Sequence, residues 1–317
     1  MNITICGASG FIGKNLVQYF SKKNTFKIRA IYFNSCIPTT IEIDGPIEWV
    51  RCDLTDKQSV QGLFNNQEAV LQFAAVTSGA KDIVERPYIH VNSNAIMNSI
   101  LIQEAFECGV EHFLFPSCSI VYHRSEIPLT EKDYDPAKPI YKTYFGSAHT
   151  KLYIEKVLEF YSSIGSMRST VIRHSNIYGP HDKFDLFRGH MLASTIIKAI
   201  AKTSEIILWG DGSLKRDFLY IDDMVDMVEK ILLKQKNPFE IYNCGSGRLT
   251  DISQLIGLLS NLLNKHLNVT YDISKPNFDF VTVLECSKAL REFGWHPKTS
   301  LEQGLDQTIN WLYNQKL

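Results

Sequence analysis

Short apolar runs alternate with longer stretches of helical periodicity through the first half of the chain. The apolar runs lie at residues 2–6, 27–32, 47–50, 69–73, 112–116 and 168–173, and the helical stretches lie near 11–22, 56–65, 88–108 and 144–164. Buried strands followed by covering helices give this pattern, and right-handed crossovers put the helices on both faces of a parallel sheet. The sequence therefore predicts an α/β protein with a doubly wound parallel sheet of the Rossmann type and a smaller C-terminal α/β lobe.

The regular alternation of strands and helices ends after Tyr178-Gly179-Pro180. A polar loop, a helix near 190–202, a short strand at 205–209 and a glycine-rich turn at 210–212 follow. Segment 219–246 holds a helix over 222–234 and a strand over 239–244, so we expect it to return to the large sheet. The predicted domains are residues 1–175 plus 219–246 for the Rossmann domain and residues 176–218 plus 247–317 for the lobe.

Composition argues against several kinds of partner. The 317 residues are 44% hydrophobic, which allows a sizeable core, and 33 Lys and Arg against 34 Asp and Glu leave a net charge of −1. Without a basic field we expect neither nucleic acid nor a membrane as partner. The seven cysteines form no Cys-x-x-Cys pair and no metal-ligand spacing, so we expect no disulfide and no metal. The first residues enter a strand directly and no long apolar run occurs, so we expect a cytoplasmic protein.

A glycine-rich turn joins the first strand to the first helix. Gly7, Gly10 and Gly13 have the spacing Gly-x-x-Gly-x-x-Gly. Such glycines permit a tight turn, close backbone approach to a pyrophosphate and close packing of helix on strand, while the helix N-terminus attracts the anion. A glycine-rich turn without a ligand is the alternative. The residues that we assign to cofactor binding here are Gly7, Ser9, Gly10, Phe11, Ile12 and Gly13.

Two further strand ends favour a dinucleotide. Asp53 closes the third strand where it can line the adenine, although a helix N-cap ahead of Thr55-Asp56 is an equal alternative. The fourth strand closes with small residues that leave space beside the cofactor. The residues that we assign to the cofactor at these two ends are Asp53, Leu54, Phe73, Ala74 and Ala75.

The loop after the second strand bears on the choice of cofactor. Residues Tyr32 to Ser35 include Asn34, which we assign to cofactor binding, but no acidic side chain to bind a ribose 2′-hydroxyl. This absence favours NADP(H) over NAD(H), although the arginine that usually binds a 2′-phosphate is also missing from the loop.

Several motifs together resemble the extended short-chain dehydrogenases/reductases. They are the glycine turn, Ala74-Ala75, Asn92, the stretch from Ser117 to Tyr122, and Lys151-x-x-x-Glu155. Within that superfamily the chain is similar to the GDP-fucose synthases in the stretch Asn176 to Phe184, in His190, and in Leu208 to Gly212 followed by Arg216.

This resemblance implies a nucleotide-sugar substrate, with a GDP-sugar favoured, a 4-keto group as hydride acceptor, and NADPH as donor. It also implies a homodimer that pairs helices 88–108 and 144–164. Arginine would hold diphosphate oxygens and tryptophan would give an apolar wall. The alternatives are a core position for Trp209 and a surface ion pair for Arg216. The implied cofactor contacts are Asn92, Lys151 and His174, and the implied substrate contacts are Asn176, His190, Lys198, Trp209 and Arg216.

The active-site motif departs from the superfamily pattern. There a tyrosine four residues before the lysine donates a proton as hydride arrives, whereas here that position is Ser147. Tyr144 lies seven residues before Lys151, roughly 10 Å along a helix axis and about 20° from the same stripe. If the first turn is unwound, Tyr144 supplies the phenol. An aromatic cap at the helix start is the alternative.

The strand-end position that usually bonds the substrate carbonyl is Cys118, which Ser117 and Ser119 flank. The thiol acts as an acid or simply packs. The epimerising cysteine of the synthases aligns with Ile120, which argues against double epimerisation, while His190 matches their acid/base histidine. The catalytic candidates are Cys118, Ser119, Tyr144, Ser147, Lys151 and His190.

Three hypotheses follow. The leading one is an NADP(H)-dependent reductase of a 4-keto sugar nucleotide that makes a deoxy- or heptose-type sugar for surface polysaccharide. The second is an epimerase or dehydratase that retains NAD through its cycle. The third, motivated by Ser147, is a catalytically impaired protein that binds cofactor or sugar nucleotide as a sensor or partner subunit.

Overall fold

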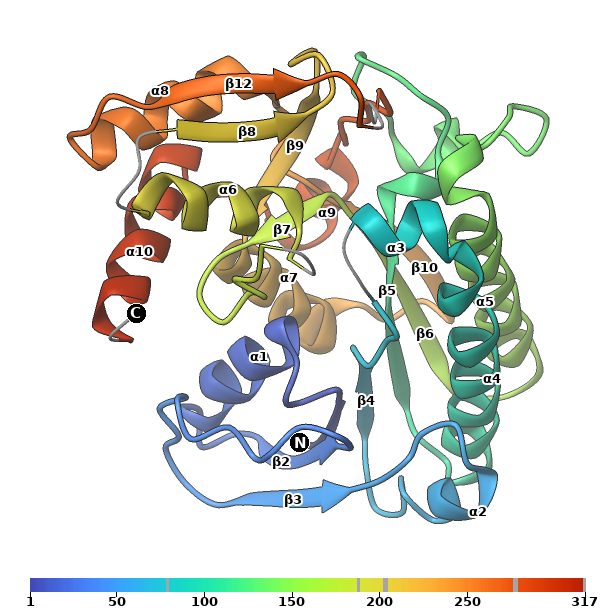
Figure 1. Ribbon diagram of the computed structural model, residues 1–317. Coiled ribbons are helices and arrows are strands. Elements are labelled where there is room, and N and C mark those ends of the chain that lie inside the picture. The colour runs from blue at the N-terminus through green and yellow to red at the C-terminus, as the bar shows by residue number, and fades with distance from the viewer. Residues whose placement is uncertain (78–79, 187–188, 202–204, 276–278, 316–317) are drawn as a thin grey trace.

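The computed structural model of the protein describes residues 1–77, 80–186, 189–201, 205–275 and 279–315. Its largest element is a seven-stranded parallel sheet in the order β10-β6-β5-β4-β1-β2-β3 (Figure 1). The chain order reverses between β1 and β4, and doubly wound sheets bind ligands in the crevice at such a point. The predicted α/β class is confirmed. The strands are β1 Asn2–Cys6, β2 Lys27–Tyr32, β3 Ile47–Arg51, β4 Ala69–Gln72, β5 His112–Cys118, β6 Arg168–His174 and β10 Phe239–Cys244.

Helices cover both faces of this sheet because alternate side chains of each strand point to opposite sides. On one face Ile3 and Ile5 of β1 pack in a core with residues of α1 and α7. On the other face Cys6 of β1 and Val70 of β4 pack with α4 and α5, which lie side by side (Figure 1). The bounds of these helices are α1 Phe11–Ser21, α7 Ile221–Lys234, α4 Asn92–Glu107 and α5 Phe145–Ile164.

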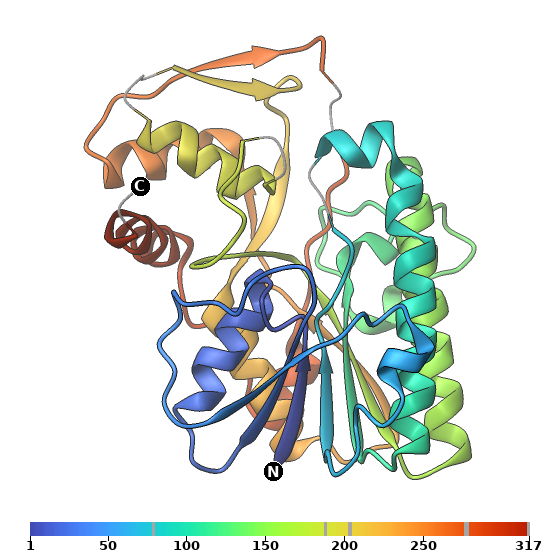
Figure 2. The ribbon, with the colours of Figure 1, turned by 60° about the horizontal axis from the view of Figure 1, so that its bottom comes forward.

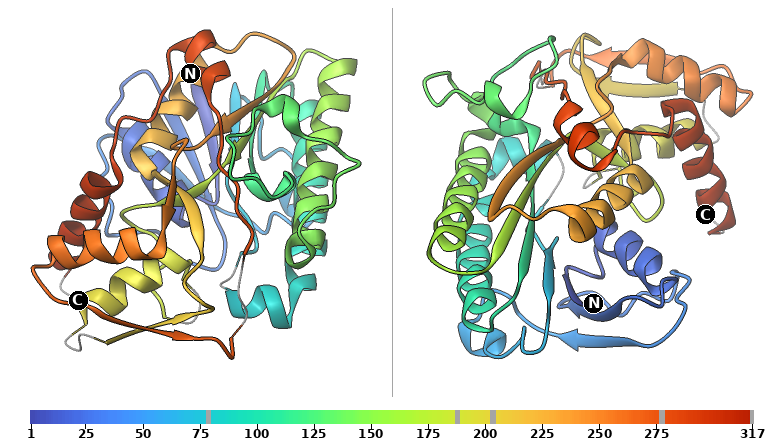
Figure 3. Two further views of the ribbon diagram at one scale, coloured as in Figure 1. Left: turned by 90° about the horizontal axis from the view of Figure 1, so that it is seen from above. Right: turned by 180° about the vertical axis from the view of Figure 1, so that it is seen from behind.

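A smaller lobe lies beside the carboxyl ends of the large sheet's strands (Figure 2). It contains a three-stranded sheet in the order β11-β9-β7 and a parallel pair, β12 and β8. Helix α9 returns behind the large sheet, next to β10 and α7 (Figure 3). These elements are β7 Asn176–Tyr178, α6 Met191–Ile200, β8 Glu205–Trp209, β9 Lys215–Tyr220, β11 Leu249–Asp251, α8 Ile252–Leu262, β12 Asn268–Asp272, α9 Ser287–Phe293 and α10 Leu301–Asn314.

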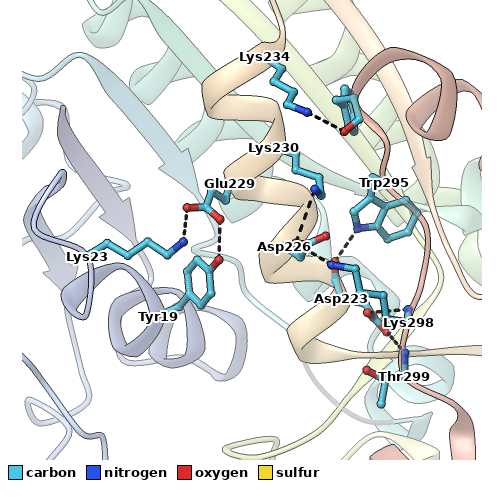
Figure 4. Close-up of polar contacts among 11 residues, drawn as sticks. Tyr19, Lys23, Asp223, Asp226, Glu229, Lys230, Lys234, Trp295, Lys298 and Thr299 are labelled. Carbon is cyan, nitrogen blue, oxygen red and sulfur yellow. Dashed lines mark hydrogen bonds and ion pairs between the residues drawn. The ribbon is translucent and has the colours of Figure 1, made fainter.

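Polar contacts join α7 to α1 on one side and to the segment after α9 on the other (Figure 4). Glu229 accepts hydrogen bonds from the Tyr19 hydroxyl at 2.6 Å and from Lys23, both on α1. The carboxylate of Asp223 accepts from the backbone N–H of Lys298 at 2.9 Å and of Thr299 at 3.1 Å. Helix α7 therefore links the helix that follows the glycine turn to the C-terminal part of the chain.

Two predicted helices differ from those observed. The stretch near 56–65 is helical only over α2, Lys57–Val60, because Gln61 has an extended ψ of 124° and Gly62 has a φ of +73°. The stretch near 88–108 begins with a 3₁₀ turn, Pro87–His90, and α4 starts only at Asn92. A short helix, α3 Ala80–Glu85, precedes that turn and was not predicted.

Among the described residues, no helix is long and apolar enough to cross a membrane. The cytoplasmic location and the division into two domains with the boundaries given above stay predictions.

Candidate active site

The glycine turn packs closely against the neighbouring strand end. A Cβ atom on Gly7 would lie 2.7 Å from the backbone of Ala74, and Gly7 has a left-handed φ of +75°. A Cβ atom on Gly13 would lie 2.0 Å from the carbonyl oxygen of Gly7. Both positions therefore require glycine, the first for the turn and the strand contact and the second for packing the helix on the turn.

The start of α1 is open toward a ligand. Gly10 is the N-cap residue, it is exposed, and no side chain caps the helix. Ser9, Phe11 and Ile12 are partly buried beside it. The free amides and the positive end of the helix dipole suit an anion, which fits the pyrophosphate of a dinucleotide.

The loop after β4, where Phe73, Ala74 and Ala75 lie, is braced by side chains that sequence reasoning did not single out. Gln72 donates to the carbonyl of Ala74 and to the side chain of Asn98, each at 3.1 Å. Asn94 accepts from the backbone N–H of Val76 at 2.9 Å and donates to its carbonyl at 3.1 Å. Asn92 itself is exposed at the first residue of α4. The signal in the sequence that could have revealed Asn94 was its amide side chain, two residues after the motif residue Asn92.

Asp53, which follows β3, is not the helix N-cap that was considered as its alternative role. Asp53 accepts hydrogen bonds from the backbone N–H of Thr55 at 2.9 Å and from its hydroxyl at 2.7 Å, while Asp56 is the N-cap of α2. Leu54 is buried in the core. Asp53 therefore stabilises the turn at the strand end and remains partly accessible there.

An arginine that the sequence did not identify lies beside the loop after β2. Arg51, the last residue of β3, donates from Nε to the carbonyl oxygen of Phe33 at 3.3 Å. Phe33, Asn34 and Arg51 are all exposed. The guanidinium comes from the adjacent parallel strand, so no spacing within the loop could have revealed it.

Lys151 reaches the carboxyl end of β5. Its Nζ donates to the carbonyl oxygen of Pro116 at 2.8 Å. Burial lowers the pKa of Lys151, and the nearby Cys118 and Glu155 act in the opposite direction. The Ser147 hydroxyl donates to the carbonyl oxygen of Tyr144 at 3.1 Å, so it stabilises the start of α5.

Tyr144 lies outside the α-helix, as its predicted role requires. It ends a 3₁₀ turn, Lys142–Tyr144, and α5 starts at Phe145. Its phenol accepts a hydrogen bond from the guanidinium of Arg216. Its ring packs against those of Tyr141 at 5.8 Å and Phe280 at 5.6 Å.

The electrostatic surroundings keep the Tyr144 phenol protonated. Burial raises its pKa, the positive charge of Arg216 lowers it, and Cys118 raises it. A protonated phenol is what a proton donor to a carbonyl needs.

Arg216 is half-buried, and its guanidinium contacts backbone carbonyls as well as Tyr144. Its Nη1 donates to the carbonyl oxygens of Lys215 at 2.9 Å and Phe280 at 2.5 Å, besides the bond to Tyr144. The guanidinium therefore connects strand β9 of the lobe to the residues that precede α5.

Two further residues lie at strand ends: His174 is the last residue of β6, and Ser119 directly follows β5. Burial, followed by the charge of Lys151, lowers the pKa of His174 to about 4, so this imidazole is neutral near pH 7. Ser119 is buried, and its carbonyl closes a 3₁₀ turn by accepting from the backbone N–H of Tyr122 at 3.1 Å. Cys118 is partly exposed in front of it.

A buried ion pair supports these residues from behind. Arg173 of β6 donates to both carboxylate oxygens of Glu155, at 3.2 and 2.6 Å, and the Ser117 hydroxyl donates to the same carboxylate at 2.5 Å. Tyr122 accepts from Arg173 at 3.1 Å. Because Glu155 follows Lys151 by one helical turn, this network holds α5 in a fixed register on β5 and β6.

The remaining substrate candidates lie in the lobe. Asn176 is exposed and donates to the carbonyl of Asp217 at 3.0 Å, and Lys198 donates to the carbonyl of Ile207 at 2.7 Å. Trp209 is 41% exposed, so the alternative core position for it is wrong. Lys275 lies over the Trp209 ring, 5.9 Å from its centre.

His190 precedes α6 and faces Asp182, with 3.5 Å between Nδ1 and the carboxylate. Cys118, Tyr144, Lys151, His174 and Arg216 thus gather at the ends of β5 and β6. His190 is close enough to influence the pKa of His174. No cluster of three or more His, Cys, Asp or Glu side chains that could hold a metal occurs within the described ranges.

Residues 3–245 match the model of the NAD dependent epimerase/dehydratase family. A GDP-L-fucose synthase of Sinorhizobium fredii is 32% identical over 80% of this chain and 82% of its own length. A UDP-glucuronate 4-epimerase of Thermodesulfobacterium geofontis is 27% identical over 97% of this chain and 94% of its own. The crystal structure of a UDP-glucose 4-epimerase from Thermotoga maritima with UDP-glucose superposes with a TM-score of 0.86, 25% identity and full coverage of both chains.

Proposed function

Because the chain belongs to the NAD dependent epimerase/dehydratase family, we propose that it is an NADP(H)-dependent reductase of a 4-keto sugar nucleotide, with the sugar linked to GDP. Its relatives include GDP-L-fucose synthases and a GDP-L-colitose synthase, as well as UDP-sugar 4-epimerases. The observation that carries the proposal is the Tyr144 phenol, which meets Cys118 and Arg216 at the strand ends near Lys151. The product would be a deoxy- or heptose-type sugar for surface polysaccharide.

The chemistry assigned to the chain's own residues is proton transfer and orientation. A nicotinamide dinucleotide bound over the glycine turn supplies the hydride. Tyr144 donates a proton to the carbonyl oxygen of the sugar, and Lys151 carries the positive charge that stabilises the developing oxyanion. The partly exposed Cys118, which acts on the pKa of both Tyr144 and Lys151, would be a further hydrogen-bond donor to this carbonyl.

The substrate would lie between the two parts of the chain. We assign the charge of Arg216 to the diphosphate oxygens and the exposed Trp209 ring, as a flat apolar surface, to the base. Asn176 and Lys198, both in the lobe, would add donors.

NADP(H) as cofactor is supported by the loop after β2. Tyr32 to Ser35 bears no carboxylate to accept from a 2′-hydroxyl, and Arg51 places a guanidinium beside the exposed Phe33 and Asn34. A 2′-phosphate would find a charge-assisted partner there. Asp53 lies at the neighbouring strand end, where the adenine would bind.

The test is reduction by the purified protein. NADPH fluorescence should fall when a GDP-linked 4-keto-6-deoxy sugar is added, and one reduced sugar nucleotide should form per NADPH consumed. Failure of all GDP-, UDP- and dTDP-linked 4-keto sugars to oxidise either NADPH or NADH would overturn the proposal.

A second candidate is a 4-epimerase that retains NAD. It is favoured by the similarity to the UDP-glucuronate 4-epimerase over 97% of this chain. Denaturing the freshly purified protein and measuring the released cofactor separates the two candidates, because the epimerase releases about one NAD per chain and the reductase does not.

A homodimer through α4 and α5 is part of the proposal. These paired helices expose several large apolar side chains to solvent, and a soluble protein rarely leaves such a surface uncovered. Light scattering on the purified protein should give twice the mass of the chain. These side chains are Ile96, Tyr153, Phe160 and Ile164.

A further inference from the structure

Asp182 is a buried carboxylate that faces an exposed histidine. Its side chain is 2% exposed, whereas that of His190 is 60% exposed, and 3.5 Å separates Oδ1 from the histidine Nδ1. The same oxygen accepts from the backbone N–H of Lys183 at 2.7 Å. A buried carboxylate is stable only when charged or polar donors satisfy it, so these two contacts account for its place in the fold.

The chain takes an uncommon conformation to put Asp182 there. His181 has a left-handed φ of +68°, and a residue other than glycine adopts this conformation only when its surroundings enforce it. The His181 ring packs against Trp311 of α10 at 4.8 Å. Asn15 of α1 donates to the carbonyl of Pro180 at 2.9 Å. The turn that carries Asp182 is therefore fixed both to α1, next to the glycine turn, and to the last helix.

We propose that Asp182 is the positioning residue of an Asp–His pair, in which its carboxylate accepts from Nδ1–H of His190 and directs Nε2–H to donate a hydrogen bond to a sugar oxygen, while the one proton that the reduction consumes comes from Tyr144. This inference rests on the function proposed above. It adds to it a positively charged hydrogen-bond donor for the sugar, on the segment between β7 and α6. The pairing of a buried carboxylate with an exposed imidazole fixes both the tautomer and the ring orientation.

The charges around His190 support this arrangement. The hydrogen bond to Asp182 raises the pKa of His190, partial desolvation by the surrounding protein and the positive charge of Lys183 lower it, and the net direction is upward. His174 is a further titratable group within electrostatic reach, and it is neutral near pH 7. A His190 that stays protonated to higher pH is a charged, and therefore stronger, hydrogen-bond donor.

The pairing can be measured without any substrate. Histidine ring signals are followed by NMR between pH 5 and 9, with His190 assigned from a His190→Asn variant. Asp182→Asn keeps the side chain's shape but removes its charge, so the His190 titration should move to lower pH. Lys183→Gln removes the opposing charge and should move it to higher pH. A His190 titration that is unchanged in Asp182→Asn would overturn the pairing.

Turnover separates a positioning role from a purely structural one. With a reducible sugar nucleotide, Asp182→Asn should lower kcat by on the order of 10- to 100-fold, shift the pH profile toward acid and leave the KM for NADPH unchanged. Asp182→Glu should restore part of kcat. Loss of kcat without a shifted pH profile, or a raised NADPH KM with full kcat, would contradict the inference. A shifted NMR titration in a protein that reduces no sugar nucleotide would overturn the proposed function while leaving the Asp–His pair established.

Discussion

Arg216 donates a hydrogen bond to the phenol oxygen of Tyr144, which joins the lobe to the turn before α5. In the superfamily pattern the phenol comes from the helix itself, four residues before the lysine. Here Ser147 takes that position and bonds the carbonyl of Tyr144 instead. In this chain the phenol of Tyr144 is therefore held by Arg216 of strand β9.

Replacing Tyr144 by phenylalanine tests this phenol as the proton donor. Removing a general acid should lower kcat by about 10²- to 10⁴-fold while NADPH still binds with its original affinity. Stopped-flow turnover and calorimetry measure the two quantities. Tyr141→Phe is the matched control, because its ring packs against Tyr144 and Phe280 in the same cluster and should turn over close to the unchanged protein. Full activity in Tyr144→Phe would assign the acid elsewhere.

Lys151→Met distinguishes an enzyme from a binding protein. The variant loses the ammonium that contacts the carbonyl of Pro116, and we expect turnover to fall at least about 100-fold. A catalytically impaired sensor would instead keep its affinity for sugar nucleotide and any effect on its partner. Lys156→Met, on an exposed position of the same helix, should leave activity unchanged.

Arg51→Gln should change the choice of cofactor. If its guanidinium binds the 2′-phosphate, the Kd for NADPH should rise about 10- to 100-fold, because a hydrogen bond to a charged group contributes about 1.5–3 kcal/mol. The Kd for NADH should remain the same. Titration calorimetry with both cofactors gives the comparison, and Lys57→Gln, an exposed charge just beyond β3, is the control. Equal losses for the two cofactors would rule out phosphate recognition by Arg51.

Gly13→Ala should abolish cofactor binding. The added Cβ would lie 2.0 Å from the carbonyl oxygen of Gly7, so the turn and α1 must separate. Gly257→Ala is the matched control, because a Cβ there meets nothing within 4 Å on an exposed part of α8. That change should stabilise the fold by about 0.5–1 kcal/mol through helix propensity. Normal NADPH affinity in Gly13→Ala would contradict the packing described here.

Buried histidines should make the fold sensitive to mild acid. Burial lowers the pKa of His112 to about 3 and of His174 and His181 to about 4, each below the value of about 6.5 in an unfolded chain. The unfolded chain then binds more protons than the folded one between those values. The free energy of unfolding is therefore highest above pH 6.5 and falls as the pH drops toward 4.

Urea denaturation at pH 7 and pH 5 measures this fall. His112→Gln should reduce the difference between the two pH values, because His112 is the most deeply buried of the three and its Nδ1 has no partner among the described residues. An unchanged difference in this variant would show that His112 does not contribute to the acid sensitivity.

The sequence by itself determined the parallel sheet and the glycine turn. Strand period and helix period are local properties, so the limits of β1 and β2 agree with prediction to the residue. The turn of Gly7, Gly10 and Gly13 is also local, since its glycines, strand and helix follow one another along the chain. The ends of two helices were less well predicted. The positive φ of Gly62 ends α2 early, and Pro87 delays the start of α4.

Only the tertiary structure decided how the site is assembled. Arg216 meets Tyr144, Arg51 meets the loop at Phe33, and Asn15 meets the turn before Asp182 because strands and helices distant in sequence pack together. Hydrophobic periodicity reports which face of an element is buried but not which element it meets. The partner of each polar group at the site is therefore set by the order of the strands, which no local pattern encodes.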